Sequence, residues 1–179
     1  EEILDELKRV PSGVIGWGYL EATKENAVFL TAAGRANYFI YRDPRDMLVS
    51  QVFFATDMHE EHGMHAYYKS LPDFGARLNV AITGIDKDGL KMVSVKQRYA
   101  GVFQWLEQKN VMCIRFEDLI NNRDATLNAM LDEVGKTGYK IPTPREKALP
   151  VLVEAIQPQK SRTFRAGKTG GWREHFTDE

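Results

Sequence analysis

The sequence predicts an α/β fold in which a parallel sheet is flanked by helices, because short strand candidates alternate with helical segments along its 179 residues. The strand candidates, at residues 14–17, 38–41 and 111–115, are rich in β-branched or aromatic side chains. Apolar spacing and start and stop residues predict helices at residues 2–9, 24–33, 44–53, 74–83, 93–108, 125–134 and 144–157. A chain of this length is expected to form one domain, residues 1–179.

Composition excludes several classes of protein. Lys and Arg number 24 against 25 Asp and Glu, so the chain has no overall basic field of the kind that favours nucleic acid. The single cysteine, Cys113, excludes an intrachain disulfide and is expected to be a core residue in a reducing compartment. The sequence has no apolar run near the ~20 residues that cross a bilayer, and no signal peptide is visible. We therefore expect a cytoplasmic protein without a nucleic-acid or membrane partner.

Residues 37–54 predict an anion-binding site where a strand turns into a helix. An aromatic strand is followed by Arg42, and Asp43 is a suitable cap for the next helix. The turn directs a cation and the free backbone N–H groups of the helix start toward one place. Ser50 lies two helical turns beyond Asp43 on the same face, so Arg42 and Ser50 could bind one phosphate. The alternative is an ordinary capped helix with a surface arginine.

Residues 158–179 predict a second, basic and glycine-rich element. A loop of this composition can surround an anion with backbone N–H groups while its cations supply charge. A solvated tail is the alternative, but the aromatic side chains Phe164, Trp172 and Phe176 indicate that the segment packs. The sequence Gly167-Lys168-Thr169 resembles the end of a Walker A loop, but Arg162 stands where that motif needs its first glycine. We therefore reject a Walker-type nucleotidase.

Together the two elements resemble motifs of the sulfotransferases that use PAPS (3′-phosphoadenosine 5′-phosphosulfate). In that family an Arg ends a strand, and a Ser follows eight residues later, as Arg42 and Ser50 do here. The tail resembles the signature R-K-G-x-x-G-D-W-K-x-x-F, with Ala166 and Gly171 as departures. The matching tail positions are Arg165, Gly167, Gly170, Trp172, Arg173 and Phe176. Between the motifs, Phe116-Glu117-Asp118-Leu119 matches the family's [YF]-E-D-L.

The resemblance implies a P-loop-like, sulfotransferase-type parallel sheet and a function. PAPS would donate a sulfuryl group to a hydroxyl, less often an amine, of a small molecule or acyl chain, and leave PAP (3′-phosphoadenosine 5′-phosphate). Arg42 and Ser50 would hold the 3′-phosphate, and Phe116 would border the adenine. The tail would contribute Arg165, Gly167 and Lys168. Tyr19, at the position of the family's histidine, and Ser50 are the candidate catalytic residues.

Two departures from the family pattern leave alternatives open. The 179 residues contain no segment like the family's P-K-[SA]-G-[TS]-[TS]-W, so the domain is expected to be incomplete at its N-terminus and very slow in sulfate transfer. Tyr19 replaces the usual base, and tyrosine side chains titrate near 10, far from a working pH near 7. Glu21 and His59 are possible substitutes. A non-catalytic module that binds PAP or PAPS, and a nucleotide kinase of similar architecture, are the alternatives.

Three histidines, His59, His62 and His65, invite a metal site within residues 57–73. On a helix, a spacing of three residues turns successive side chains apart, and no carboxylate or cysteine pattern completes a ligand set. We predict no metal site. We interpret the segment as a mobile, aromatic-rich loop over an active site.

Overall fold

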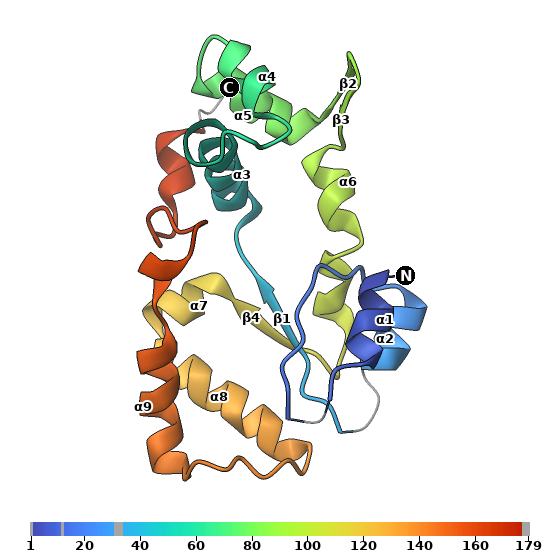
Figure 1. Cartoon of the computed structure of the whole chain (residues 1–179), viewed down its shortest axis with the longest axis vertical. Helices are drawn as coiled ribbons and strands as arrows, with labels where there is room; N and C mark the ends of the chain where they lie inside the picture. The colour runs from blue at the N-terminus through green and yellow to red at the C-terminus, as the bar shows by residue number, and fades with distance from the viewer. Residues whose placement is uncertain (1, 12, 31–33, 177–179) are drawn as a thin grey trace. The chain divides into compact units, whose positions relative to one another are not determined.

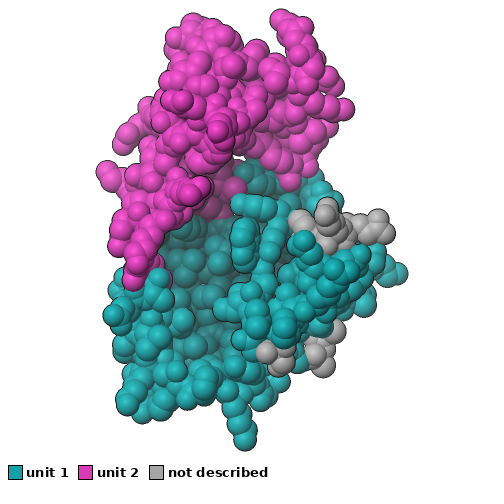
Figure 2. Space-filling model, in the orientation of Figure 1, with its two compact units in different colours: residues 1–41, 99–155 teal, residues 42–98, 156–179 magenta. Residues whose placement is uncertain are grey.

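The computed structural model describes residues 2–11, 13–30 and 34–176, and it divides into two compact units. Unit 1 comprises residues 1–41 and 99–155, and unit 2 comprises residues 42–98 and 156–179 (Figure 2). The chain first leaves unit 1 between Tyr41 and Arg42, which is the predicted end of a strand.

A two-stranded parallel sheet lies in unit 1 (Figure 1). Strand β1 (Tyr38–Tyr41) pairs with β4 (Met112–Arg115), and Tyr38 lies opposite Met112. This parallel pairing of strands far apart in the sequence confirms the predicted α/β class. The other elements of unit 1 are α1 (Glu2–Lys8), α2 (Lys24–Leu30), the 3-10 helix η2 (Phe103–Glu107), α7 (Phe116–Asn121), α8 (Arg123–Lys136) and α9 (Arg145–Ala155).

Apolar packing and one long-range hydrogen bond hold the sheet of unit 1. Trp105 is buried with Ala22 and Val111, and Phe39 packs against this cluster. Cys113 packs there as well but is only half-buried, and burial raises the pKa of its thiol. The Tyr38 hydroxyl donates to the Met130 carbonyl oxygen of α8 at 2.7 Å, and burial raises its pKa to about 12. β1 is thereby tied to a helix as well as to β4.

Unit 2 is organised around helix α3 (Pro44–Phe53). Three buried residues of α3 form a core with five buried residues that come after it in the chain. The eight residues are Leu48, Val49, Val52, Ala55, Met64, Tyr68, Leu78 and Ala81. Trp172 and Phe176 of the C-terminal segment pack against this core. Figure 1 shows the C-terminal segment, in red, beside α3. The other elements are the π-helix η1 (Phe54–Met58), α4 (His65–Ser70), α5 (Phe74–Thr83), β2 (Ile85–Lys87), β3 (Leu90–Met92), α6 (Val95–Ala100, whose last residues belong to unit 1), η3 (Pro158–Lys160) and η4 (Gly171–Glu174).

The predicted strand at residues 14–17 is wrong. These residues form neither strand nor helix, and Ile15 and Trp17 are 91% and 85% exposed. A strand requires a neighbour that accepts and donates its backbone hydrogen bonds. In the described part of the chain, the ladder of β1 is with β4, and β-branched composition alone does not make a strand of residues 14–17.

Two predicted helices differ in length from the observed ones, and a third cannot be fully compared. The predicted helix at residues 93–108 is interrupted near Gly101, whose carbonyl oxygen accepts the Ala22 N–H at 3.0 Å and so serves a contact outside the helix. Helix α9 continues through Pro150 and ends at Ala155, two residues before the predicted end. Helix α2 ends at Leu30, and the predicted extension over residues 31–33 lies outside the described residues.

Residues 57–73 are not a loop, which corrects the interpretation of this segment. They contain the end of the π-helix η1, a turn and helix α4, and Met64 and Tyr68 are buried in the core of unit 2. The π-helix continues α3 directly, and the Thr56 hydroxyl donates to the Val52 carbonyl oxygen at 2.8 Å. Strands β2 and β3 form a hairpin, and its turn residues Asp88 and Gly89 are both at positive φ.

No helix in the described ranges is long and apolar enough to span a membrane.

Candidate anion-binding site

The start of α3 has the geometry that its sequence predicts. The Asp43 carboxylate caps the helix and accepts the Arg45 N–H at 2.9 Å, and Pro44 is the first helical residue. The Arg45 side chain also pairs with Asp43 at 2.6 Å, and these hydrogen bonds hold the pKa of the Asp43 carboxyl below its usual range. Arg45 and Asp43 therefore neutralise each other at the helix start.

Arg42 joins the two motifs. Its Nη2 donates to the Lys168 carbonyl oxygen at 2.5 Å and lies 3.7 Å from Asp46 Oδ2. The Arg42 side chain is 22% exposed, so most of the guanidinium stem is covered. Arg42, which follows the strand and is predicted to bind a phosphate, thus contacts the tail. The tail is predicted to surround the same phosphate.

Asp46 is the residue that sequence reasoning missed. It lies in the first turn of α3, but it is 3% exposed and bonds to the tail. Its Oδ2 accepts the Gly170 N–H at 2.7 Å and its Oδ1 accepts the Trp172 N–H at 3.0 Å. The sequence contains one usable signal, an acid four residues after Arg42, but the partners lie more than 120 residues away.

Cations and aromatic rings of the tail lie along α3. The Arg45 guanidinium carbon is 3.5 Å from the centre of the Trp172 ring, and that of Arg173 is 4.7 Å from it. Arg165 lies over Phe53, one turn beyond Ser50, with 4.4 Å to the ring centre. The tail therefore follows α3 from its start to its last turn.

The packing predicted for the tail is confirmed for two of its three aromatic residues. Trp172 and Phe176 pack on the core of unit 2, whereas Phe164 is 40% exposed. Phe164 instead covers Gly167, which has φ +58°, and a Cβ there would lie 2.9 Å from the ring. Gly167 thus allows both a left-handed turn and the close approach of an aromatic ring.

Five of the seven predicted site residues belong to one compact unit. Arg42, Ser50, Arg165, Gly167 and Lys168 all belong to unit 2. Ser50 is half-buried on α3, one turn after Asp46, and the side chains of Arg165 and Lys168 are exposed.

Tyr19 and Phe116 belong to unit 1. Tyr19 is 87% exposed, and the neighbouring Leu20 carbonyl oxygen accepts the Trp105 indole N–H at 2.7 Å. Phe116 is the first residue of α7 and is half-buried. The Tyr19 backbone is thus anchored on its C-terminal side while its side chain faces solvent.

The rings of His59 and His62 contact each other and Phe54, and His65 bonds to a backbone group. His62 Nδ1 accepts the Met64 N–H at 3.1 Å, and His65 Nδ1 lies 2.9 Å from the Ala55 carbonyl oxygen. The ring of His59 lies edge to face with that of Phe54. Burial lowers the pKa of His62, and the nearby His59 and His65 lower it further. Among the residues that the structure describes, no three His, Cys, Asp or Glu side chains are grouped to hold a metal ion.

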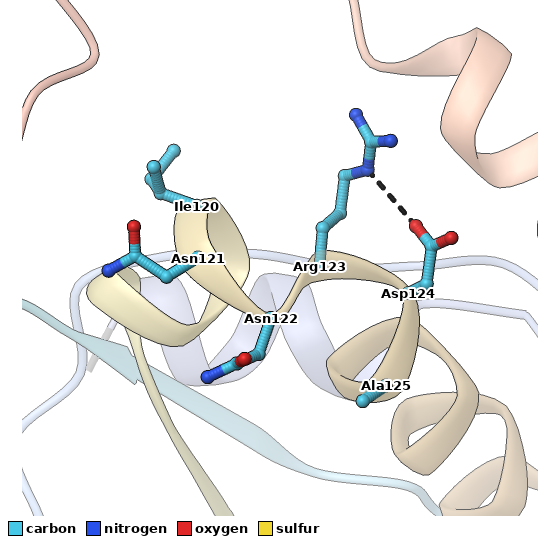
Figure 3. Close-up of a pocket in the computed structure, with 6 residues that line it drawn as sticks. All are labelled: Ile120, Asn121, Asn122, Arg123, Asp124 and Ala125. Carbon is cyan, nitrogen blue, oxygen red and sulfur yellow. Dashed lines mark hydrogen bonds and ion pairs between the residues drawn. The ribbon is translucent and has the colours of Figure 1, made fainter.

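A shallow depression of about 420 Å³ lies elsewhere, in unit 1. It is lined by residues 120–125 at the junction of α7 and α8, where Arg123 Nε pairs with Asp124 Oδ1 at 3.3 Å (Figure 3). Its lining contains none of the residues predicted to bind the anion.

Comparison with known proteins decides the family. A sequence model described as "Sulfotransferase domain" matches residues 38–179, which is most of the chain. The chain belongs to the sulfotransferase family. The match begins at β1 and includes the α3 motif, the Phe116 motif and the whole tail.

A solved sulfotransferase has a similar fold. The crystal structure of mouse sulfotransferase SULT7A1 complexed with PAP matches with a TM-score of 0.60 and 16% sequence identity. The match covers 97% of this chain and 63% of that one, so the chain spans less than two thirds of the length of that sulfotransferase. No curated protein sequence matches this chain significantly. At this identity the structural likeness establishes the fold alone.

Proposed function

We propose that this sulfotransferase-family chain binds PAP and PAPS at the start of α3, and that the enzyme to which the site belongs transfers a sulfuryl group to a hydroxyl of a small molecule or acyl chain. The observation that carries the proposal is the contact of Arg42 with the Lys168 carbonyl oxygen, since it joins the strand-end motif to the basic tail. Residues 158–179 are then the cofactor-binding tail. An amine is the less favoured acceptor.

The charges at the start of α3 fit an anionic ligand. Residues 42–53 and 165–176 together carry five cationic side chains and three carboxylates, Asp43, Asp46 and Glu174, and Asp43 is neutralised by Arg45. Asp46 is turned toward backbone N–H groups of the tail. The cationic side chains are Arg42, Arg45, Arg165, Lys168 and Arg173. This surplus of positive charge suits a ligand with several phosphate charges.

Each residue has a role in the proposal. Arg42 and the Ser50 hydroxyl would bind the 3′-phosphate, and Phe116 would border the adenine ring. Arg165, Lys168 and the backbone at Gly167 would surround the ligand from the tail. PAPS would supply the sulfuryl group, and Tyr19 would lie where a base receives the acceptor's proton.

The second candidate function is PAP binding without catalysis. Tyr19 favours it, because this residue stands where the family has a histidine. A radiolabelled-sulfate assay against phenols, alcohols and hydroxyacyl thioesters separates the two functions. Turnover supports the enzyme, whereas tight PAP binding without turnover supports the binding module.

The 3′-phosphate contact is tested by Arg42→Ala and Ser50→Ala. Loss of a hydrogen bond to a charged group costs roughly 1.5–3 kcal/mol, so we expect Arg42→Ala to weaken PAP binding about 10- to 150-fold. Ser50→Ala is expected to weaken it about 2- to 10-fold, without disturbing the tail. Titration calorimetry with PAP and with adenosine 5′-phosphate measures both effects.

Adenosine 5′-phosphate lacks the 3′-phosphate, so its affinity should change little in either variant. Lys69→Ala removes one exposed positive charge from the same unit and serves as the control for general electrostatics. Unchanged PAP affinity in both Arg42→Ala and Ser50→Ala would remove the assignment of this motif.

A further inference from the structure

We infer that Asp46 is a positioning residue of the anion site, which holds the tail against α3 without touching the ligand. The inference rests on the proposed function, because the ligand concerned is the same. Both carboxylate oxygens of Asp46 accept backbone N–H groups of the tail, from Gly170 at 2.7 Å and from Trp172 at 3.0 Å. The two contacts fix the start of helix η4 to the first turn of α3.

The orientation of the Asp46 side chain is unusual for its position in the helix. An acidic side chain in the third position of a helix usually faces solvent or returns to the N–H of the capping residue. Here Asp43 caps the helix, and Asp46 is 3% exposed with its carboxylate turned to the tail. A carboxylate that is removed from water needs hydrogen-bond donors, and the tail supplies two of them.

Arg42 completes the arrangement. Its Nη2 lies 3.7 Å from the Asp46 carboxylate and donates to the Lys168 carbonyl oxygen at 2.5 Å. The tail is thus held at Lys168 by a donor from the strand end and at Gly170 and Trp172 by an acceptor from the helix. Asp46 consequently sets the place of the tail cations relative to Arg42 as well as the direction of the Arg42 guanidinium.

Because the donors are backbone N–H groups, the two hydrogen bonds need no particular side-chain chemistry at residues 170 and 172, although φ +75° at residue 170 favours glycine. The positioning depends instead on an acceptor with two oxygens at residue 46. Asparagine has the same shape but only one acceptor atom, and its amide group would meet the second N–H with another donor. Asp46→Asn is therefore expected to retain one of the two tail contacts, and Asp46→Ala neither.

The test compares order of the tail, global stability and ligand binding in the 179-residue chain. Trypsin cleavage after Arg165, Lys168 or Arg173 reports release of the tail, urea unfolding reports global stability, and calorimetry reports binding of PAP. We expect Asp46→Ala to raise the cleavage rate in the tail and the Kd for PAP about tenfold or more, and Asp46→Asn to give intermediate values for both. Asp57→Ala, which removes an exposed carboxylate that pairs with Lys69, is the control and should change neither.

A structural role alone would lower the urea midpoint and raise cleavage throughout the chain. A positioning role predicts that the cleavage rate rises only in the tail. It also predicts that Asp46→Asn gives a cleavage rate and a Kd for PAP between those of the unaltered chain and of Asp46→Ala. Unchanged cleavage of the tail in Asp46→Ala would overturn the inference, as would released tail with unchanged PAP affinity. If Asp46→Ala does not fold, the same comparison is made with Asp46→Asn. If the unaltered chain fails to bind PAP, the proposed function fails, and the cleavage measurements decide on their own whether Asp46 positions the tail.

Discussion

Removal of residues 161–179 is expected to abolish PAP binding and to destabilise unit 2. The deletion removes Trp172 and Phe176 from the core that α3 organises, and it leaves the Asp46 carboxylate without its two backbone donors. Loss of a large aromatic side chain from a core costs roughly 3–5 kcal/mol. Thermal unfolding followed by circular dichroism, together with calorimetry with PAP, measures both effects.

The double variant Arg165→Ala/Lys168→Ala is the matched control for this deletion. Both side chains are exposed. The variant keeps Trp172 and Phe176, which pack on the core, and the backbone N–H groups that bond to Asp46. Binding of PAP should weaken while the melting temperature stays close to that of the unaltered chain. A truncated chain that melts at the same temperature and binds PAP equally well would show that the tail is a solvated end.

Gly84→Ala is expected to destabilise unit 2 by about 3 kcal/mol, since backbone strain and overpacking each cost about 1–3 kcal/mol. Gly84 ends helix α5 with φ +81°, and its N–H donates to the Val80 carbonyl oxygen at 2.9 Å. A Cβ at this position would lie 2.4 Å from the Met92 carbonyl oxygen and 2.8 Å from the Ser94 nitrogen. Those neighbours are backbone atoms, so relief requires movement of the chain after β3. Urea unfolding measures the change in the free energy of unfolding.

Gly89→Ala separates the two causes of this destabilisation. Gly89 has φ +80° in the hairpin turn, but no described atom lies within 4 Å of the Cβ that alanine would add. It therefore bears only the conformational cost, about 1 kcal/mol. Equal destabilisation in the two variants would mean that the close approach of β3 to Gly84 contributes nothing.

Much of the local structure follows from the sequence, because it depends on residues close together in the chain. The aromatic run at residues 38–41 forms β1, and helix α5 has the predicted bounds. The cap at Asp43 was predicted because its carboxylate needs only the N–H groups of the next turn. The order of the two motifs was also sufficient to indicate the family, which the match over residues 38–179 establishes.

The strand prediction at residues 14–17 shows where this reasoning stops. Val14, Ile15 and Trp17 have strand-like composition, yet the segment is irregular and its large side chains are exposed. A strand is defined by hydrogen bonds to another segment, and composition does not say whether such a partner is present. The interruption of the helix predicted at residues 93–108 also depends on a distant partner, because the Ala22 N–H donates to the Gly101 carbonyl oxygen.

The sequence by itself determined the strand, the capped helix and the basic composition of the tail, since propensity, capping and charge are properties of neighbouring residues. Only the tertiary structure decided that Asp46 accepts the Gly170 and Trp172 N–H groups and that Arg42 meets the Lys168 carbonyl oxygen. These contacts join residues more than 120 positions apart, and two of the three partners are backbone N–H groups that every residue except proline carries. No residue type in the tail could therefore indicate them, and they exist only because the folded chain places the tail beside α3.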